Sequence, residues 1–216
     1  MNKRELINSW DIYVITNETL SNGRSNVDIA TAALIGGARV IQLRDKTASS
    51  LKLYNDAITI RQLTRQAGAT FIVNDRLDIA LAADADGLHI GQKDLPANIV
   101  RKFLGDEKIL GVSALSLEEA QAAKAFGADY LGVGPIYAAN KTKSDADPPI
   151  GPENLKLIAE SIDLPIVAIG GINLDNVLDV IKAGAGSAAI ISAIVSAADI
   201  ADSTRQFIRS IRHAYQ

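Results

Sequence analysis

Eight short apolar runs recur along the chain, and each is followed by a segment with the pattern of a helix. The runs occupy residues 11–16, 39–44, 70–75, 86–91, 108–113, 129–134, 165–170 and 187–192. They are too continuously apolar for the one-sided strands of an antiparallel sheet. Such runs are typical of parallel strands that are covered on both faces. The alternation therefore predicts an α/β fold built on a parallel sheet.

The segments between these runs carry helix signals. We expect helices over residues 26–38, 50–68, 115–128, 151–161, 174–185 and 199–216. The first and third of these close with glycine, which is a common helix stop. The second repeats apolar side chains at spacings of three and four. Pro152 stands at the expected first position of the fourth, where a helix tolerates proline.

A repeated junction favours a closed barrel. The strings GGARVIQL, FGADYLGV and AGAGSAAII each pass from the end of a helix through Gly-Ala into a strand. Eight units in 216 residues average 27 residues, enough for one (β/α)8 TIM barrel over residues 1–216, with residues 1–10 as a short N-terminal extension. The alternative is a doubly wound open sheet. It requires a Gly-rich fingerprint after the first strand, and VITNETLSNGRS contains no G-x-G-x-x-G.

Composition excludes several classes of function. The net charge is −3 and the pI about 5.4, so nothing favours broad attraction to nucleic acid or membranes. Cysteine is absent, which excludes disulfides and thiolate chemistry. No apolar stretch approaches the roughly 18 residues of a membrane span, and the N-terminus lacks the apolar run of a signal peptide. We expect a soluble cytoplasmic protein. The sequence does not determine its oligomeric state, and a homo-oligomer is possible.

Polar residues gather where the predicted strands end. In a (β/α)8 barrel the chemistry lies at the C-terminal ends of the strands. The residues found there are Gln42, Arg44, Lys46, Asn74, Asp75, His89, Gln92, Asp94, Ser113, Asn140, Thr142, Lys143, Gly171 and Ser192. Helix faces alone would not produce this concentration. For His89, inside its run, a buried and hydrogen-bonded role is favoured over acid–base chemistry.

The second run ends in an alternating polar strip. Gln42, Arg44 and Lys46 share one side of an extended chain, so Leu43 and Asp45 should point the other way. The strip is about 13 Å long, which suits a molecule with a head and a charged tail. The alternative is that Arg44 and Lys46 pair with carboxylates at the rim of the barrel.

Asp75 and Asp94 follow neighbouring strands and predict a Mg²⁺ site. Mg²⁺ is held by one or two carboxylates, with water and phosphate oxygens completing its octahedron. No Cys/His cluster points to zinc. The alternative is that the two aspartates cap the helices of residues 76–83 and 95–104.

Two further segments favour anions. AIGGIN after the seventh run and ISAI after the eighth fall where many such barrels bind phosphate. The loop of residues 136–152 is long and polar, and it carries Lys141 and Lys143. We expect a lid over an anionic substrate, and a disordered surface loop is the alternative. Two anion sites in one opening indicate a transferase that joins two small phosphorylated substrates, one with a metal-bound diphosphate.

These features resemble the thiamine phosphate synthase family in all eight units. The matching strings are YVIT, VIQLRDK, FIVNDRLDIAL, ADGLHIGQKDL, ILGVSA, YLGVGPIY, TKSDA, PIVAIGGIN and IISAI. The resemblance implies that 4-amino-2-methyl-5-(diphosphooxymethyl)pyrimidine is joined to a thiazole phosphate to give thiamine phosphate. Diphosphate would leave first, assisted by Mg²⁺, and the thiazole nitrogen would capture the cation that remains.

The resemblance also implies the roles of individual residues. The pyrimidine diphosphate would be held by Gln42, Leu43, Arg44, Asp45, Lys46, Asn74, Ser113 and Lys143. Of these, Arg44, Lys46, Ser113 and Lys143 would be catalytic. Mg²⁺ would be held by Asp75 and Asp94. The thiazole phosphate would be held by Asn140, Lys141, Thr142, Gly171, Ile191 and Ser192.

One stretch departs from the family pattern. The family usually reads Pro-Thr-x-Thr-Lys soon after GPIY, whereas this chain reads AANKTK, which is one residue longer. Either Ala139 or Asn140 therefore takes the place of the first threonine. An asparagine amide can still hydrogen-bond a phosphate or a carboxylate.

Two other functions remain as alternatives. A thiazole tautomerase, an isomerase on the same fold, needs no metal-bound diphosphate, so VNDR and GQKDL argue against it. A barrel that binds phosphorylated ligands without catalysis would not need the complete set of cations and carboxylates.

Overall fold

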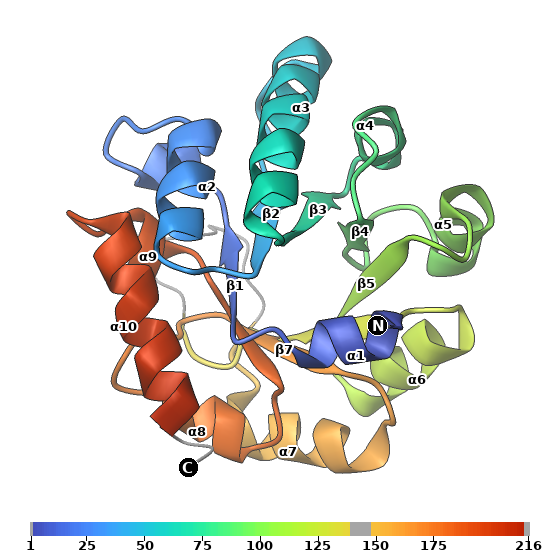
Figure 1. Ribbon diagram of the computed structural model, residues 1–216. Helices are drawn as coiled ribbons and strands as arrows, with labels where there is room; N and C mark the ends of the chain where they lie inside the picture. The colour runs from blue at the N-terminus through green and yellow to red at the C-terminus, as the bar shows by residue number, and fades with distance from the viewer. Residues whose placement is uncertain (1, 139–147, 214–216) are drawn as a thin grey trace.

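Eight parallel strands close into a barrel inside a ring of helices (Figure 1). The structure is a computed structural model that describes residues 2–138 and 148–213. Each strand pairs with the next along the chain, and β8 pairs with β1. The strands are β1 (Ile12–Ile15), β2 (Val40–Leu43), β3 (Thr70–Asn74), β4 (Gly87–Ile90), β5 (Ile109–Ala114), β6 (Tyr130–Val133), β7 (Ile166–Ile169) and β8 (Ser187–Ile190). The predicted (β/α)8 barrel is confirmed.

The expected helices also form. The helices are α1 (Lys3–Asn8), a short 3₁₀ helix η1 (Glu18–Leu20), α2 (Asn26–Ile35), α3 (Ser50–Ala67), α4 (Leu77–Ala82), α5 (Ala97–Leu104), α6 (Leu117–Ala125), α7 (Gly151–Ser161), α8 (Val177–Lys182), α9 (Ser192–Val195) and α10 (Ile200–His213). Pro152 is the second residue of α7 and not the first, because Gly151 already belongs to the helix. None of the helices in the described ranges is long and apolar enough to cross a membrane.

The strands separate two apolar layers. Along β2, Ile41 and Leu43 belong to the large core between the barrel and the helices, whereas Val40 belongs to a smaller core inside the barrel. Gln42 also faces inward, where it contacts Tyr13 of β1. Successive side chains of a strand point to opposite faces, so each strand contributes to both layers.

The N-terminal extension closes one end of the barrel. Helix α1 lies in front of the strands in Figure 1, at the end where the strands begin. Ile7 and Trp10 are buried in the inner core, and the Trp10 ring centroid lies 5.7 Å from that of Tyr13 and 5.4 Å from that of Tyr130. Both contacts are edge-on, an arrangement that aromatic rings favour. The opposite end of the barrel is left for the site.

Two glycines make room for rings inside the barrel. A Cβ atom on Gly111 would lie 2.1 Å from Cζ of Tyr130, and one on Gly132 would lie 2.7 Å from Cε1 of His89. Real Cβ atoms do not approach other atoms so closely, so any side chain at these positions would displace a ring. The Tyr130 ring therefore depends on a glycine of the neighbouring strand β5, and the His89 ring depends on a glycine of β6, two strands away from β4.

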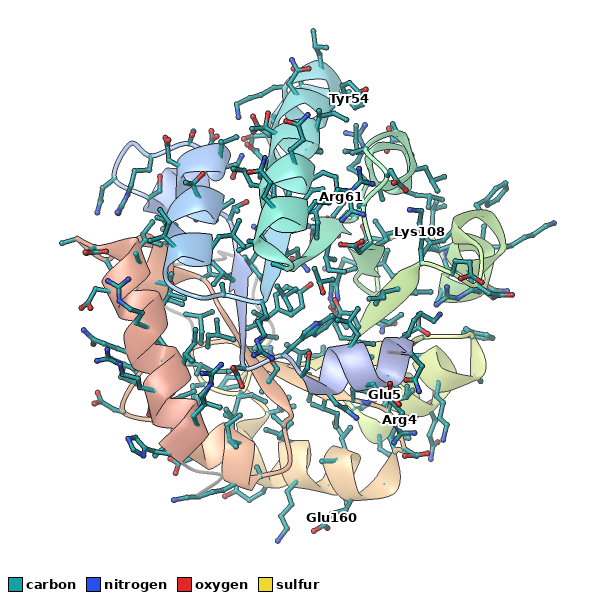
Figure 2. The ribbon with its side chains drawn as sticks, in the orientation of Figure 1. Arg4, Glu5, Tyr54, Arg61, Lys108 and Glu160 are labelled. Carbon is teal, nitrogen blue, oxygen red and sulfur yellow. The ribbon has the colours of Figure 1, made fainter. Side chains whose placement is uncertain are left out.

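Partly buried ion pairs hold two of the helices against the start of the strands. Arg61 of α3 contacts Asp86 at 2.6 Å, and Arg101 of α5 contacts Asp129 at 2.6 Å. Figure 2 shows Arg61 beside the strands that α3 covers. Each carboxylate also accepts a backbone N–H of the neighbouring strand, from Phe71 for Asp86 at 2.8 Å. Asp129 accepts the corresponding bond from β5 at 2.8 Å.

Replacing Arg101 with methionine should destabilise the barrel. The change leaves the partly buried Asp129 carboxylate with Lys3 as its remaining cation and removes the donor to the carbonyl oxygens of Gly127 and Lys108. Together these losses should cost about 3 kcal/mol of unfolding free energy. Chemical denaturation measures the effect. The control is Arg209→Met on α10, because Arg209 is exposed and should change stability by less than about 0.5 kcal/mol. Equal stability of the two variants would contradict a structural role for the Arg101–Asp129 pair.

Candidate active site

The loops that follow the strands meet in two groups at the open end of the barrel. The loops after β2, β3 and β4 are joined by Lys46, Asp75 and Asp94. The loops after β6 and β7 are joined at Gly171, where an added Cβ would lie 2.7 Å from Cβ of Tyr137. The expected site residues Asn140, Lys141, Thr142 and Lys143 lie outside the described residues, so their roles stay predictions.

The polar strip of β2 divides into a buried and an open part. Gln42 is 2% exposed, and its side chain lies inside the barrel. Arg44 is partly buried, and its guanidinium makes no hydrogen bond or ion pair with the residues that the structure describes. Lys46 is exposed, and its Nζ lies 3.2 Å from the Asp75 carboxylate. Pairing with a rim carboxylate is therefore seen for Lys46 but not for Arg44.

Leu43 and Asp45 point away from this strip, as the alternation predicts. Leu43 lies in the outer core, so its side chain does not reach the barrel opening. The Asp45 carboxylate accepts hydrogen bonds at 2.9 Å from the backbone of Thr47 and of Ala48. Partial burial alone would raise the pKa of Asp45, but these bonds outweigh it and lower the pKa. The Asp45 side chain thus shapes the turn after β2.

Asp75 and Asp94 are not helix caps. The residue that caps α4 is Arg76 and the one that caps α5 is Pro96, and neither helix has a side-chain cap. Asp94 instead accepts the Gly91 backbone N–H at 2.7 Å. Asp75 has a left-handed backbone with φ of 61°, which an aspartate adopts only rarely. The alternative that these carboxylates serve as helix caps is therefore excluded.

The two carboxylates lie close enough to influence each other. Burial raises the pKa of Asp94, the neighbouring Asp75 carboxylate raises it further, and Lys46 acts in the opposite direction. No third carboxylate or histidine joins them within the described ranges. Two adjacent oxygen ligands at an open rim fit Mg²⁺, which keeps several waters and binds substrate phosphate through its remaining positions.

The turn after β7 is built from two glycines that no other residue could replace easily. Gly170 and Gly171 have φ of 98° and 65°. Side chains there would be strained and would also clash with the loop that follows β6. Nearby, β8 ends before Ile191, and Ser192 begins α9, so the Ser192 N–H has no carbonyl in the preceding turn of the helix to bond. Glycine turns with free N–H groups suit an anion.

A line of polar side chains crosses the inside of the barrel beneath this opening. Gln42 donates to the Tyr13 hydroxyl at 2.7 Å, and that hydroxyl lies 2.8 Å from the hydroxyl of Tyr130. His89 Nδ1 lies 3.0 Å from the Tyr130 hydroxyl, and Nε2 lies 2.9 Å from Ser113 Oγ. The expected hydrogen-bonded His89 is confirmed. Sequence reasoning missed both tyrosines, although Gly111 on β5, which pairs with Tyr130 and leaves room for its ring, was a signal for one of them.

A family model described as thiamine monophosphate synthase matches residues 12–194, which is most of the chain. The chain belongs to this family. It is 53% identical to a thiamine-phosphate synthase of Moorella thermoacetica, over 95% of this chain and 97% of that protein. It is 51% identical to a thiamine-phosphate synthase of Chloroflexus aurantiacus, over 91% of this chain and 90% of that protein.

A solved structure of the same family supports the fold. Thiamine phosphate pyrophosphorylase from Pyrococcus furiosus superposes with a TM-score of 0.90 and is 41% identical, covering 98% of this chain and all of that one. Together with the family match, this confirms the resemblance seen in the sequence, the barrel fold and the enzyme class, a transferase.

Asp94→Ala should remove metal binding without unfolding the barrel. The loss of one hydrogen bond from Gly91 should cost at most about 1 kcal/mol of unfolding free energy. Calorimetry with Mg²⁺ and diphosphate should show a large loss of affinity. The control is Asp106→Ala, because Asp106 is exposed in the loop between α5 and β5, at the end of the barrel opposite this site. Normal Mg²⁺ affinity in Asp94→Ala would contradict the metal site.

Proposed function

We propose that the protein joins the aminopyrimidine diphosphate to the thiazole phosphate, giving thiamine phosphate and diphosphate. The observation that carries the proposal is the carboxylate pair of Asp75 and Asp94, together with Arg44, whose guanidinium has no partner among the described residues. They lie at the end of the barrel that also carries the glycine turn at Gly171. Family membership supports the same reaction, because its relatives are named thiamine-phosphate synthases.

The reaction is a substitution at the methylene carbon of the pyrimidine. The bond from that carbon to the diphosphate oxygen breaks, and its electron pair leaves with diphosphate. The thiazole nitrogen then supplies the lone pair for the new carbon–nitrogen bond. No proton has to be moved, so a site for this reaction needs no general base. The described mouth residues agree, because both ring nitrogens of His89 are already hydrogen-bonded inside the barrel.

Charge stabilisation therefore carries most of the catalysis. Asp75 and Asp94 would hold Mg²⁺, which neutralises negative charge on the diphosphate when bound. Arg44 presents a guanidinium with no competing partner among the described residues. Lys46 lies beside Asp75 and can contact the same diphosphate, and Lys143 is proposed to reach it from the loop after β6. Cations fixed in advance cost no reorganisation when the leaving group takes up its charge.

The thiazole phosphate is proposed to lie on the other side of the opening. Gly171, Ile191 and Ser192 follow β7 and β8, where barrels of this type commonly bind phosphate. Residues 140–142 are proposed to contribute from the preceding loop, which continues from the segment packed against Gly171. Two phosphorylated molecules held at opposite sides would have their reacting atoms face each other over the barrel axis.

A thiazole tautomerase remains the second candidate. Such an isomerase acts on one phosphorylated molecule and must move a proton. The Asp75–Asp94 pair has no evident use in that reaction, which favours the synthase. A barrel that only binds its ligands would form no product from either substrate.

Mixing the purified protein with both substrates and Mg²⁺ tests the function directly. Thiamine phosphate and diphosphate should appear in equal amounts, a chelator should stop the reaction, and added Mg²⁺ should restore it. Isomerised thiazole phosphate as the sole product would establish the tautomerase. If the protein shows a normal unfolding transition but forms no product, the remaining function is ligand binding without catalysis.

Arg44→Ala should lower kcat/KM by about a hundredfold, the usual effect of removing one charge-stabilising donor. Its stability should change by less than about 0.5 kcal/mol, because the guanidinium has no partner to leave behind among the described residues. Steady-state kinetics and denaturation measure the two effects. The matched control, Arg209→Ala, should behave as the unmodified protein. A large loss of stability in Arg44→Ala would make Arg44 structural.

A further inference from the structure

The polar line inside the barrel is continuous from β2 to β5. We call it the interior network, and its members in order are Gln42, Tyr13, Tyr130, His89 and Ser113. Both ends are residues that the resemblance assigns to the pyrimidine diphosphate, whereas nothing assigns a role to the three residues between them. Each of the four links is between 2.7 and 3.0 Å, within the normal range of hydrogen bonds.

The first half of the interior network has one consistent direction. Gln42 donates its amide N–H to the Tyr13 oxygen, so the Tyr13 proton is free to point toward Tyr130. Burial raises the pKa of Tyr13 and that of Tyr130 well above the ordinary value of a tyrosine, so both hydroxyls keep their protons. With its oxygen accepting from Tyr13, Tyr130 donates onward to the ring of His89.

The second half follows from the first. A ring nitrogen that accepts a hydrogen bond carries no proton of its own, so the proton of the neutral His89 ring belongs on Nε2. Nε2 then donates to the Ser113 oxygen 2.9 Å away. The Ser113 hydroxyl is left with its own proton to donate elsewhere, and no described residue accepts it. Ser113 is partly exposed near the end of β5, so the proton is available to a ligand in the opening.

We propose that the interior network runs in this single direction and thereby holds Ser113 as a hydrogen-bond donor toward the mouth of the barrel. Tyr13, Tyr130 and His89 are positioning residues, because they act through Ser113. The consequence for catalysis rests on the proposed function: the acceptor is an anionic oxygen of the pyrimidine diphosphate. A donor aimed at that oxygen strengthens as the leaving group gains charge.

Packing holds the rings of the interior network in place. The rings of Tyr130 and His89 occupy space that a side chain on Gly111 or Gly132 would fill, and Trp10 packs edge-on against Tyr130. Gln92 donates to the Ser113 backbone oxygen at 2.6 Å, which holds the end of β5 in place. In the reverse direction Tyr13 would have to donate its proton to the Gln42 amide nitrogen, which already directs its own N–H at Tyr13. The reverse direction would also turn the lone pairs of Ser113 toward the diphosphate.

Nitrogen-15 NMR of the imidazole decides the direction without any activity measurement. The chain has two histidines, so His213→Gln leaves His89 as the only imidazole signal. The expected result in the full chain without substrates is a neutral ring protonated on Nε2 with a hydrogen-bonded Nδ1. A ring protonated on Nδ1, or on both nitrogens, would overturn the proposal and would leave the synthase function untouched.

Tyr130→Phe tests whether the direction matters for turnover. Without its donor, Nδ1 should lose the hydrogen-bonded shift, and kcat should fall by about tenfold, the value of one hydrogen bond to a charged group. KM for the thiazole phosphate should not change. The control is Tyr54→Phe, the same chemical change on a side chain that projects outward from α3 (Figure 2).

The alternative result is equally clear. A folded Tyr130→Phe with an unchanged imidazole spectrum and full turnover would show that the interior network only packs the barrel. Should Tyr130→Phe not fold, the spectrum of the His213→Gln protein still decides the direction. Activity absent from the unmodified protein would instead contradict the proposed function, so the two failures are distinguishable.

Discussion

The narrow interior of the barrel is the constraint on which the other features depend. Closing eight parallel strands leaves space for only a few large inward side chains, and here two tyrosines, a histidine and Trp10 occupy it. Gly111 and Gly132 leave room for the rings of Tyr130 and His89. The two tyrosine hydroxyls and the imidazole bond one another, because an unpaired buried hydroxyl is costly. The packing of the barrel therefore dictates the hydrogen bonds below the site.

Charged residues are arranged differently at the two ends of the barrel: the base, where the strands begin, and the mouth, where they end. At the base, Arg101 and Asp129 neutralise each other at 2.6 Å and fasten a helix to the barrel. At the mouth, Arg44 has no such partner in the described ranges, and Asp75 and Asp94 lie beside each other despite their like charge. Lys46 offsets the charge of Asp75 only in part. An unpartnered guanidinium and two adjacent carboxylates lower stability unless a ligand completes them. They mark the mouth as the place where charged molecules bind.

The sequence pattern predicted the strands, the family and most of the polar residues that follow the strands. Each of these depends on local periodicity or on a short string at the end of a strand. The pattern also placed Leu43 correctly on the opposite face from Gln42. It did not find the Tyr13–Tyr130 contact, whose residues are 117 positions apart. Nor did it distinguish a capping aspartate from one that faces its neighbour, because both stand before a helix.

The sequence by itself determined the alternation of strand and helix and the order in which polar residues emerge at the strand ends. Both are properties of neighbouring residues, which the period of a strand or helix controls. Tertiary structure alone decided which of those residues meet. Closure of β8 onto β1 and the space left by Gly111 and Gly132 brought Gln42 and Ser113 into one network, because only the closed barrel makes their strands share an interior.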